Sequence, residues 1–223
     1  MSSIKELSIE KKTMEEKKDI NWQLREVKRM LRGVMSGPVS ASMRGQGLNY
    51  KVNFGVDQPR LRELSAEIIG FSDDAYALAQ ALWKENIREC RILACMIMPP
   101  DRFPSDMAME WVEQLHYAEE AQALVMYLLS EEAYAADMAF RLVAAEEKMQ
   151  RLVAWLIFGR VFGMGKNLTD RDADEMLDHA LAELKDQTAD MELRRTALNA
   201  LNRYMDLGRA EEARGMRILD ALQ

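Results

Sequence analysis

The helical spacing of apolar residues is the feature that most constrains how this chain can fold. Leu24, Val27 and Leu31 step by three and four, which places them on one stripe of an amphipathic helix. The same spacing recurs along most of the chain, whereas the β-branched residues are scattered and do not alternate as they would in a strand. Hydrophobic residues make up 48% of the chain, which excludes a disordered protein. The sequence therefore predicts an all-α fold.

Turn and capping signals divide this pattern into short segments. Asp57 followed by Pro59 is typical of a helix start, and Thr169 with Asp172 resembles a capping box. Many helices of roughly 10–16 residues favour a solenoid of HEAT-like repeats, an α–α superhelix with a concave face; the alternative is a compact all-helical bundle. We expect a charged N-terminal extension over 1–19 and one repeat domain over 20–223. The helices expected after residue 100 span 104–116, 119–129, 131–144, 146–162, 190–206 and 209–222, and a further helix starts after Thr169 and runs through Leu184.

The charge balance limits how the protein can meet nucleic acid. The chain has 37 acidic and 30 basic residues and a net charge of -7, which excludes a protein that coats nucleic acid by charge alone. Residues 1–70 nevertheless carry 13 basic and 9 acidic side chains, so this third is the best candidate for a polyanion contact. Five arginines could form a phosphate-contacting rim, the alternative being ordinary surface ion pairs. They are Arg29, Arg32, Arg60, Arg194 and Arg195.

Several chemical patterns are incomplete. Gly159 and Gly165 do not have the spacing of a phosphate-binding P-loop, so they predict a helix end and a turn. Glu113 and His116 form one E-x-x-H step, but a di-iron bundle needs a second such step and two further Glu. We therefore expect no metal and no cofactor.

The cysteines and the apolar runs bear on location. Cys90 and Cys95 lie in one apolar run and would point about 140° apart on a helix, so we expect buried thiols rather than a disulfide. The apolar runs reach about half of the ~20 residues that a membrane span needs. The first 19 residues lack the apolar core of a secretory signal. We expect a cytoplasmic protein without membrane contact.

Four stretches of the sequence resemble a known family. Leu31–Met43, with Tyr50–Leu64, resembles the N-terminal region of the bacterial DNA-alkylation-repair family of AlkD-like glycosylases. Leu82–Ala94 looks like the next family block, and Leu193–Tyr204 is similar to the family's I-R-K-x-I-x-W-x-L-R-x-Y helix. The resemblance covers about 20–210. It implies HEAT-like repeats with a concave, cationic DNA-binding face, and excision of N-alkylated purines by cleavage of the glycosidic bond.

The resemblance also implies where a catalytic cleft would lie. The family cleft uses two Trp, an Asp and an Arg. Aligned on its first aromatic residue, Tyr117 replaces the Trp and Ala121 the Asp; shifted by one position, His116 and Glu120 take those places. The candidate catalytic residues are therefore Tyr117 and Glu120, with the carboxylate stabilising a sugar cation.

The remaining cleft positions are replaced. Asp137 stands where the family has its Arg, and Asn199 stands where the late helix has its Trp. Two hypotheses follow. The first is a divergent DNA alkylation repair protein that binds DNA through its concave face, with glycosylase activity if the altered cleft still works. The alternative is a non-catalytic HEAT-like scaffold that binds a protein or a structured nucleic acid.

Overall fold

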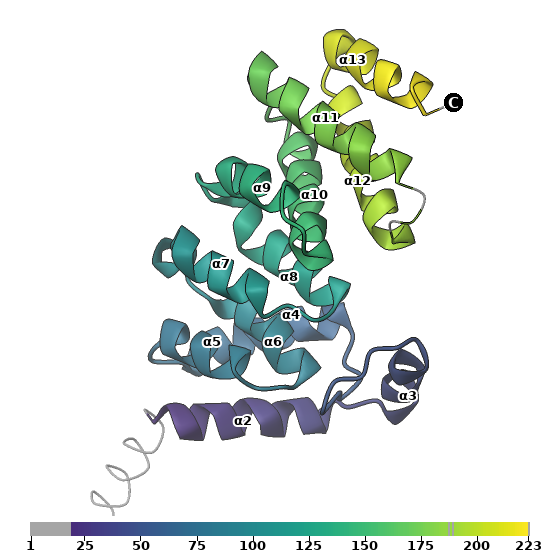
Figure 1. The fold of residues 1–223 in the computed structure, drawn as a ribbon. Coiled ribbons are helices and arrows are strands. Elements are labelled where there is room, and N and C mark those ends of the chain that lie inside the picture. The colour runs from purple at the N-terminus through teal and green to yellow at the C-terminus, as the bar shows by residue number, and fades with distance from the viewer. Residues whose placement is uncertain (1–18, 187, 189, 223) are drawn as a thin grey trace, which may run out of the picture. The chain divides into compact units, whose positions relative to one another are not determined.

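The computed structural model describes residues 19–186, 188 and 190–222, and this part of the chain is almost entirely helical (Figure 1). Its one β-bridge joins Val52 and Ile87. The all-α prediction is confirmed, while the expected extension over 1–19 lies almost wholly outside the described residues. The helices are α2 (Ile20–Gly33), α3 (Gly37–Gly45), α4 (Gln58–Phe71), α5 (Ala75–Trp83), α6 (Arg88–Ile97), α7 (Ser105–Glu113), α8 (Ala118–Tyr127), α9 (Ala135–Val143), α10 (Lys148–Gly163), α11 (Asp170–Lys185), α12 (Met191–Met205) and α13 (Arg209–Asp220), with 3-10 turns at Pro100–Arg102 and Leu129–Glu131.

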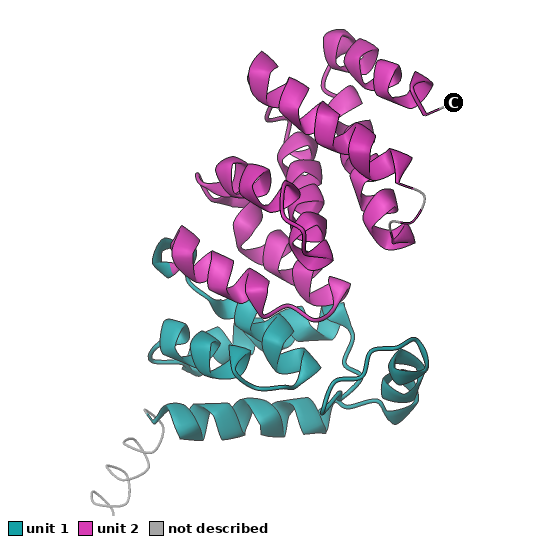
Figure 2. Cartoon of the chain, in the orientation of Figure 1, with its two compact units in different colours: residues 1–102 teal, residues 103–223 magenta. Residues whose placement is uncertain are grey.

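The chain divides into two compact units, residues 1–102 and residues 103–223, called unit 1 and unit 2 (Figure 2). In unit 1, α6 packs against α4 and α5, and α2 packs against α5. In unit 2, α10 is the central helix and packs against α8, α9 and α12, while α13 packs against α11 and α12. The prediction of one domain over 20–223 stays a prediction.

The helix starts follow the side chains that cap them. The Asp57 carboxylate accepts a hydrogen bond from the Arg60 backbone N–H at 2.9 Å, and Thr169 Oγ1 accepts one from Asp172 N–H at 3.3 Å. Asp74 and Asp190 cap α5 and α12 in the same way. These bonds satisfy N–H groups that have no partner inside the helix. Short-range signals therefore placed these starts correctly.

The core of unit 2 is a row of aromatic side chains along α10. Trp155 and Phe158 have ring centroids 5.7 Å apart, Phe158 and Phe162 stack at 6.0 Å, and Phe162 meets Tyr204 of α12 at 5.4 Å. All four side chains are buried. This row fixes the face that α10 turns towards α12. It therefore positions the polar residues that lie beside it on both helices.

Three local predictions differ from the structure. The sequence pattern gave no helix over Gly37–Gly45, because α3 buries only Ser40 and has no apolar stripe. The helix expected over 104–116 ends at Glu113, so His116 lies in the connection to α8. The segment expected as helix over 131–144 becomes helical only from Ala135, after a 3-10 turn.

The thiols are as predicted, since Cys90 and Cys95 are both buried and neither is in a disulfide within the described residues. Burial raises the pKa of the Cys90 thiol far above its ordinary value. Among the described residues, no helix combines the length and the apolar character that crossing a membrane requires.

Candidate nucleic-acid interface

Unit 2 contains a cavity of about 190 Å³, open to solvent, between α8, α10 and α12. Most of its lining side chains are polar, and three of them are arginines: Arg160, Arg195 and Arg203. We call it the arginine cavity. The other lining residues are Gln122, Trp155, Leu156, Gly159, Glu192, Thr196, Asn199 and Ala200.

Two glycines bring α12 close to α10 at this cavity. Gly159 and Gly163 are one helical turn apart and lie on the same face of α10. A Cβ at Gly159 would already stand 3.8 Å from the Ala200 Cα, and a Cβ at Gly163 would collide with the Arg203 guanidinium. The glycine face therefore lets the Arg203 side chain lie directly against α10. A larger residue at Gly163 would move this guanidinium.

The cavity has an excess of positive charge. Arg195, Asn199 and Arg203 repeat every four residues along one face of α12, and Arg160 adds a third guanidinium from α10. Glu192 is the one carboxylate among the lining residues. None of the three arginines forms an ion pair with any residue that the structure describes. Guanidinium groups without a protein counter-ion are well suited to bind an anion from solution.

Trp155 adds an unsatisfied donor to the cavity wall. Its side chain is fully buried, and its indole Nε1–H has no hydrogen-bond acceptor within the described part of the chain. A buried indole N–H normally finds an acceptor. The cavity thus combines three guanidinium groups with one buried donor behind its wall, and it is large enough to admit several water molecules.

The predicted catalytic residues lie at the start of α8. Glu120 is 1% exposed, and its Oε2 accepts hydrogen bonds from the backbone N–H of His116 at 2.9 Å and of Tyr117 at 3.4 Å. This is the carboxylate half of a capping box, which holds the turn before the helix. Tyr117 is the N-cap residue and is half-buried. Neither residue lines the arginine cavity, and their catalytic role stays a prediction.

The five predicted rim arginines have different surroundings. In unit 1, Arg29 donates from Nε to Glu26 at 2.9 Å, and Arg60 pairs with Glu63, as ordinary i,i+3 surface pairs. Arg32 is exposed in the last turn of α2.

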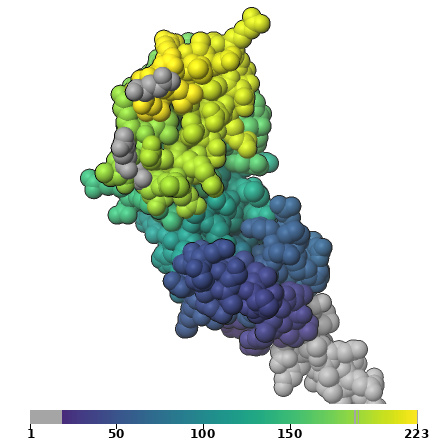
Figure 3. All heavy atoms as spheres, turned by 90° about the vertical axis from the view of Figure 1, so that its right-hand side faces the viewer, coloured from purple at the N-terminus to yellow at the C-terminus, as the bar shows by residue number. Residues whose placement is uncertain are grey.

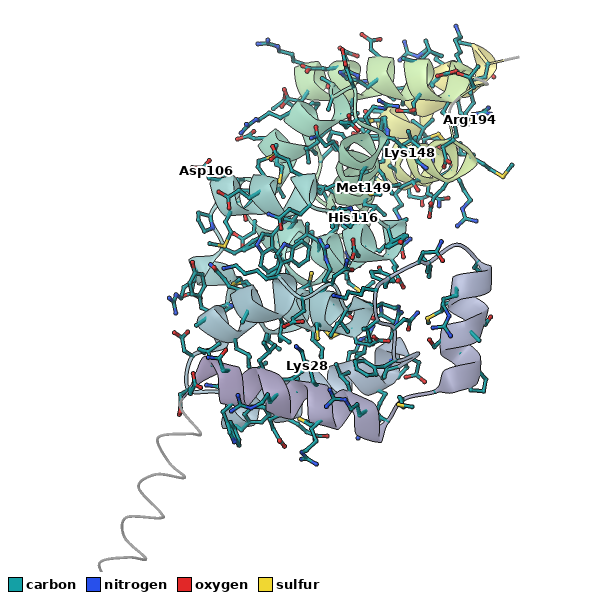
Figure 4. The ribbon with its side chains drawn as sticks, turned by 60° about the horizontal axis from the view of Figure 1, so that its bottom comes forward. Lys28, Asp106, His116, Lys148, Met149 and Arg194 are labelled. Carbon is teal, nitrogen blue, oxygen red and sulfur yellow. The ribbon has the colours of Figure 1, made fainter. Side chains whose placement is uncertain are left out.

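In unit 2, the neighbouring arginines Arg194 and Arg195 are used differently. Arg194 donates to the Leu184 carbonyl at 3.2 Å, whereas Arg195 is exposed and lines the arginine cavity. Lys148, at the start of α10, pairs with Asp190 at 2.8 Å and so ties α10 to the N-cap of α12, which carries Arg194 (Figure 4). This contact lowers the pKa of Asp190 through a hydrogen bond and charge attraction. Of the five rim residues, the structure places Arg195 in the cavity.

Sequence reasoning missed Arg160 and Arg203. A usable signal was present, because the i, i+4, i+8 spacing of Arg195, Asn199 and Arg203 predicts a polar stripe on one helix face. Gly159 and Gly163 carry the matching signal on α10, although a glycine-rich stretch also predicts a helix end. The small-residue spacing instead marks where a second helix approaches.

Short helices packed in succession, with a cationic cavity on one unit, define an all-α helical-repeat protein. The family described as DNA alkylation repair enzyme matches residues 27–201. The chain therefore belongs to the DNA alkylation repair enzyme family.

The fold has a counterpart among solved structures. That structure is described as a new family of proteins related to the HEAT-like repeat DNA glycosylases with affinity for branched DNA structures. The match has a TM-score of 0.72 and 15% sequence identity, and it covers 89% of this chain and 83% of the other. The predicted HEAT-like repeat fold is thereby confirmed. No curated protein sequence matches the chain significantly.

Proposed function

We propose that this protein binds the phosphate backbone of DNA through the arginine cavity, and that it recognises branched DNA rather than excising a base. The observation that carries the proposal is the convergence of Arg160, Arg195 and Arg203 on one open cavity without a paired carboxylate. Membership of the family and the branched-DNA affinity of the similar structure support it. The proposal joins the two hypotheses from the sequence, since branched DNA is a structured nucleic acid.

The chemistry of the cavity fits a phosphodiester. Arginine presents a planar fork of N–H donors that matches two phosphate oxygens, and such charge-assisted pairs are about twice as strong as neutral hydrogen bonds. Each phosphate neutralised on duplex DNA releases counter-ions, so the logarithm of the affinity falls with that of the salt concentration by about 0.9 per contact. Three phosphate contacts from the cavity arginines therefore predict a slope near -3 when the logarithm of the affinity is plotted against that of the salt concentration.

Two features argue for binding without excision. Asn199, in the cavity wall, stands where the family has an aromatic cleft residue, so the stacking face is absent at this position. Glu120 is buried and holds backbone N–H groups, so its carboxylate is engaged in the fold. A carboxylate that stabilises a sugar cation must face that cation.

Fluorescence anisotropy with a labelled four-way junction tests the binding proposal. The double variant Arg195→Gln/Arg203→Gln should weaken binding by about 10- to 100-fold and reduce the salt slope by about 2. Arg171→Gln is the matched control, because Arg171 is an exposed arginine of α11 that does not line the cavity. It should change the affinity little. Equal affinity for the wild type and the double variant would contradict the proposal.

Base release from DNA containing a methylated purine tests the catalytic hypothesis separately. We expect no release above background even with protein in excess over DNA. If release is seen, Glu120→Gln should abolish it while the helical circular dichroism is retained, and this result would assign a catalytic role to Glu120; Tyr117→Phe would test Tyr117 in the same way. A protein partner and a cytoplasmic location stay predictions from the sequence.

A further inference from the structure

A second surface with the character of a nucleic-acid contact lies in unit 1. Residues 27–56 contain no Asp or Glu, although the whole chain has 37 acidic residues. Glu26 and Asp57 flank this stretch, which we call the acid-free segment. It includes the end of α2, all of α3 and the loop before α4. Its basic residues are Lys28, Arg29, Arg32, Arg44 and Lys51.

The start of α3 and the residues just before it present apolar side chains to solvent. Met35 is 60% exposed and Val39 is 38% exposed, and Pro38 between them is exposed as well. Met35 lies two residues before α3, whereas Pro38 and Val39 lie in its first turn, and the helix buries only Ser40. Figure 3 shows α3 and the following loop as a surface knob of unit 1, in dark blue. An exposed apolar cluster beside basic residues differs from the polar surface expected of a short surface helix.

The loop that follows α3 holds the helix in place. The Ser36 backbone N–H donates to the Phe54 carbonyl at 2.8 Å, and Ser40 Oγ donates to the Asn53 carbonyl at 2.8 Å. Gly55 has φ +71°, and a Cβ there would collide with the Ser36 carbonyl oxygen and stand 2.6 Å from the Ser40 nitrogen. The close approach requires glycine. The helix is therefore held through Ser36 and Ser40, while Pro38 and Val39 stay exposed.

A buried ion pair anchors the same loop to the core of unit 1. The Glu89 carboxylate accepts from Phe54 N–H at 3.0 Å and from Val56 N–H at 3.2 Å. Arg88 pairs with Glu89 at 3.2 Å and donates to the Val56 carbonyl at 2.9 Å. Both charged side chains are almost fully buried. The anchor gives α3 a defined position relative to α6, as a rigid recognition element requires.

We propose that the acid-free segment binds DNA at a branch point, where Met35 and Val39 pack against the base pair left open at the end of a stack. The inference rests on the proposed DNA-binding function and adds to it a second contact, which supplies the preference for branches. The partner is identified by its charge and its shape. Lys28 and Arg29 pair with Glu85 and Glu26 outside the segment. Arg32, Arg44 and Lys51 form no ion pair with a residue that the structure describes, so these three cations complement a polyanion. An unstacked base pair is the apolar face that DNA offers beside its phosphates.

Proteins that bend or open DNA use the same combination. Apolar side chains such as Met, Pro and Leu enter an unstacked base step while nearby cations hold the phosphates. At a branch point the step is already open, so the unstacking energy of a continuous duplex is not required. Stacking of one base on an aromatic side chain is worth roughly a factor of 10 or more in affinity, and each of the smaller Met and Val side chains contributes less. The apolar pair should therefore favour junctions over duplex by about 10-fold.

The test compares a three-way junction with a continuous duplex of the same length, using full-length protein and anisotropy at fixed salt. Met35→Ser/Val39→Ser should lose about 10-fold in junction affinity and nothing in duplex affinity. Ile69→Ser is the matched control, because Ile69 is a 51% exposed apolar residue of the same unit that lies outside the acid-free segment. It should bind both DNAs as the wild type does.

A spectroscopic readout separates contact with bases from a general effect. With 2-aminopurine at the branch point, wild-type binding should change the probe fluorescence, and Met35→Ser/Val39→Ser should not, even at saturating protein. A second variant, Arg32→Gln/Lys51→Gln, tests the charge. It should reduce the salt slope of junction binding by about 2. An unchanged salt slope would show that Arg32 and Lys51 do not contact phosphates.

The outcomes distinguish this inference from the proposed function. In one outcome the wild type binds DNA, the arginine-cavity variant does not, and Met35→Ser/Val39→Ser binds junctions as the wild type does. The α3 inference is then wrong and the proposed function stands. If the wild type binds no DNA even at low salt, both are wrong. Junction preference that survives every α3 variant would assign branch recognition to another surface.

Discussion

The Arg88–Glu89 pair offers the sharpest test of how unit 1 holds α3, and the perturbation is Glu89→Gln. The wild-type carboxylate accepts from two backbone N–H groups and from the Arg88 guanidinium, and it is fully buried. Glutamine keeps the shape and one acceptor oxygen. Its amide nitrogen, however, carries two N–H donors, and these would point at another donor, either a backbone N–H or the guanidinium.

The magnitude follows from these contacts. Removing one partner of a buried ion pair leaves an uncompensated charge and costs about 3–5 kcal/mol. Because Gln retains one of the accepted hydrogen bonds, we expect the lower end, about 3 kcal/mol. This is a large share of the roughly 5–15 kcal/mol that stabilises a typical domain.

Urea unfolding measures the loss, with Glu85→Gln as the control. Glu85 pairs with Lys28 at 2.7 Å, but both side chains are partly exposed, so its removal should cost about 0.5 kcal/mol. At a typical urea dependence of roughly 1.5 kcal/mol per M, the midpoint should fall by about 2 M for Glu89→Gln and by about 0.3 M for the control. Hydrogen exchange at the Phe54 and Val56 amides should accelerate in Glu89→Gln alone.

A loss below about 1 kcal/mol, equal to that of the control, would refute the reasoning that a buried charge network anchors the loop. Unchanged exchange at the two amides would refute it as well. The double variant Arg88→Met/Glu89→Gln provides a further check. Its destabilisation should be clearly smaller than the sum of the two single changes, because the stranded charge is gone.

Other predictions follow from single contacts. Gly163→Ala should displace the Arg203 guanidinium and lower DNA affinity about threefold in anisotropy without lowering the thermal midpoint, since Ala favours a helix over Gly; an unchanged affinity would remove this guanidinium from the interface. Tyr134→Phe deletes the hydrogen bond from the hydroxyl to the Phe103 carbonyl at 2.6 Å and should cost about 1 kcal/mol in urea unfolding. Because burial raises the pKa of Cys90, the folded protein keeps a proton that the unfolded chain releases above about pH 8.5. Stability should therefore fall as the pH rises beyond that value, and Cys90→Ala should flatten the fall in urea midpoints between pH 8 and 10; an equal slope would contradict this assignment.

Family and fold were accessible from the sequence because their signals are local. A cap such as Asp57 acts within one helical turn, and the stripe formed by Val27 and Leu31 is a property of a single segment. The block Leu193–Tyr204 carried the family resemblance in the same way. None of these signals depends on which helices are neighbours in space, so the all-α fold and the repeat class could be predicted.

The sites depended on which helix faces meet, and only the tertiary structure decided that. Arg203 becomes part of a cavity because Gly163 lets it lie against α10, and the sequence distance between them conceals this contact. Arg88 and Glu89 look like ordinary surface charges in the sequence, yet they are buried because a loop more than thirty residues earlier folds over them. Helix α3 has no apolar stripe and is held by hydrogen bonds from Ser36 and Ser40 to that loop. The sequence by itself determined the helices and the family, because caps and periodicity act over a few residues. The structure determined the cavity, the anchor and the exposed knob, because these depend on contacts between residues far apart in the chain.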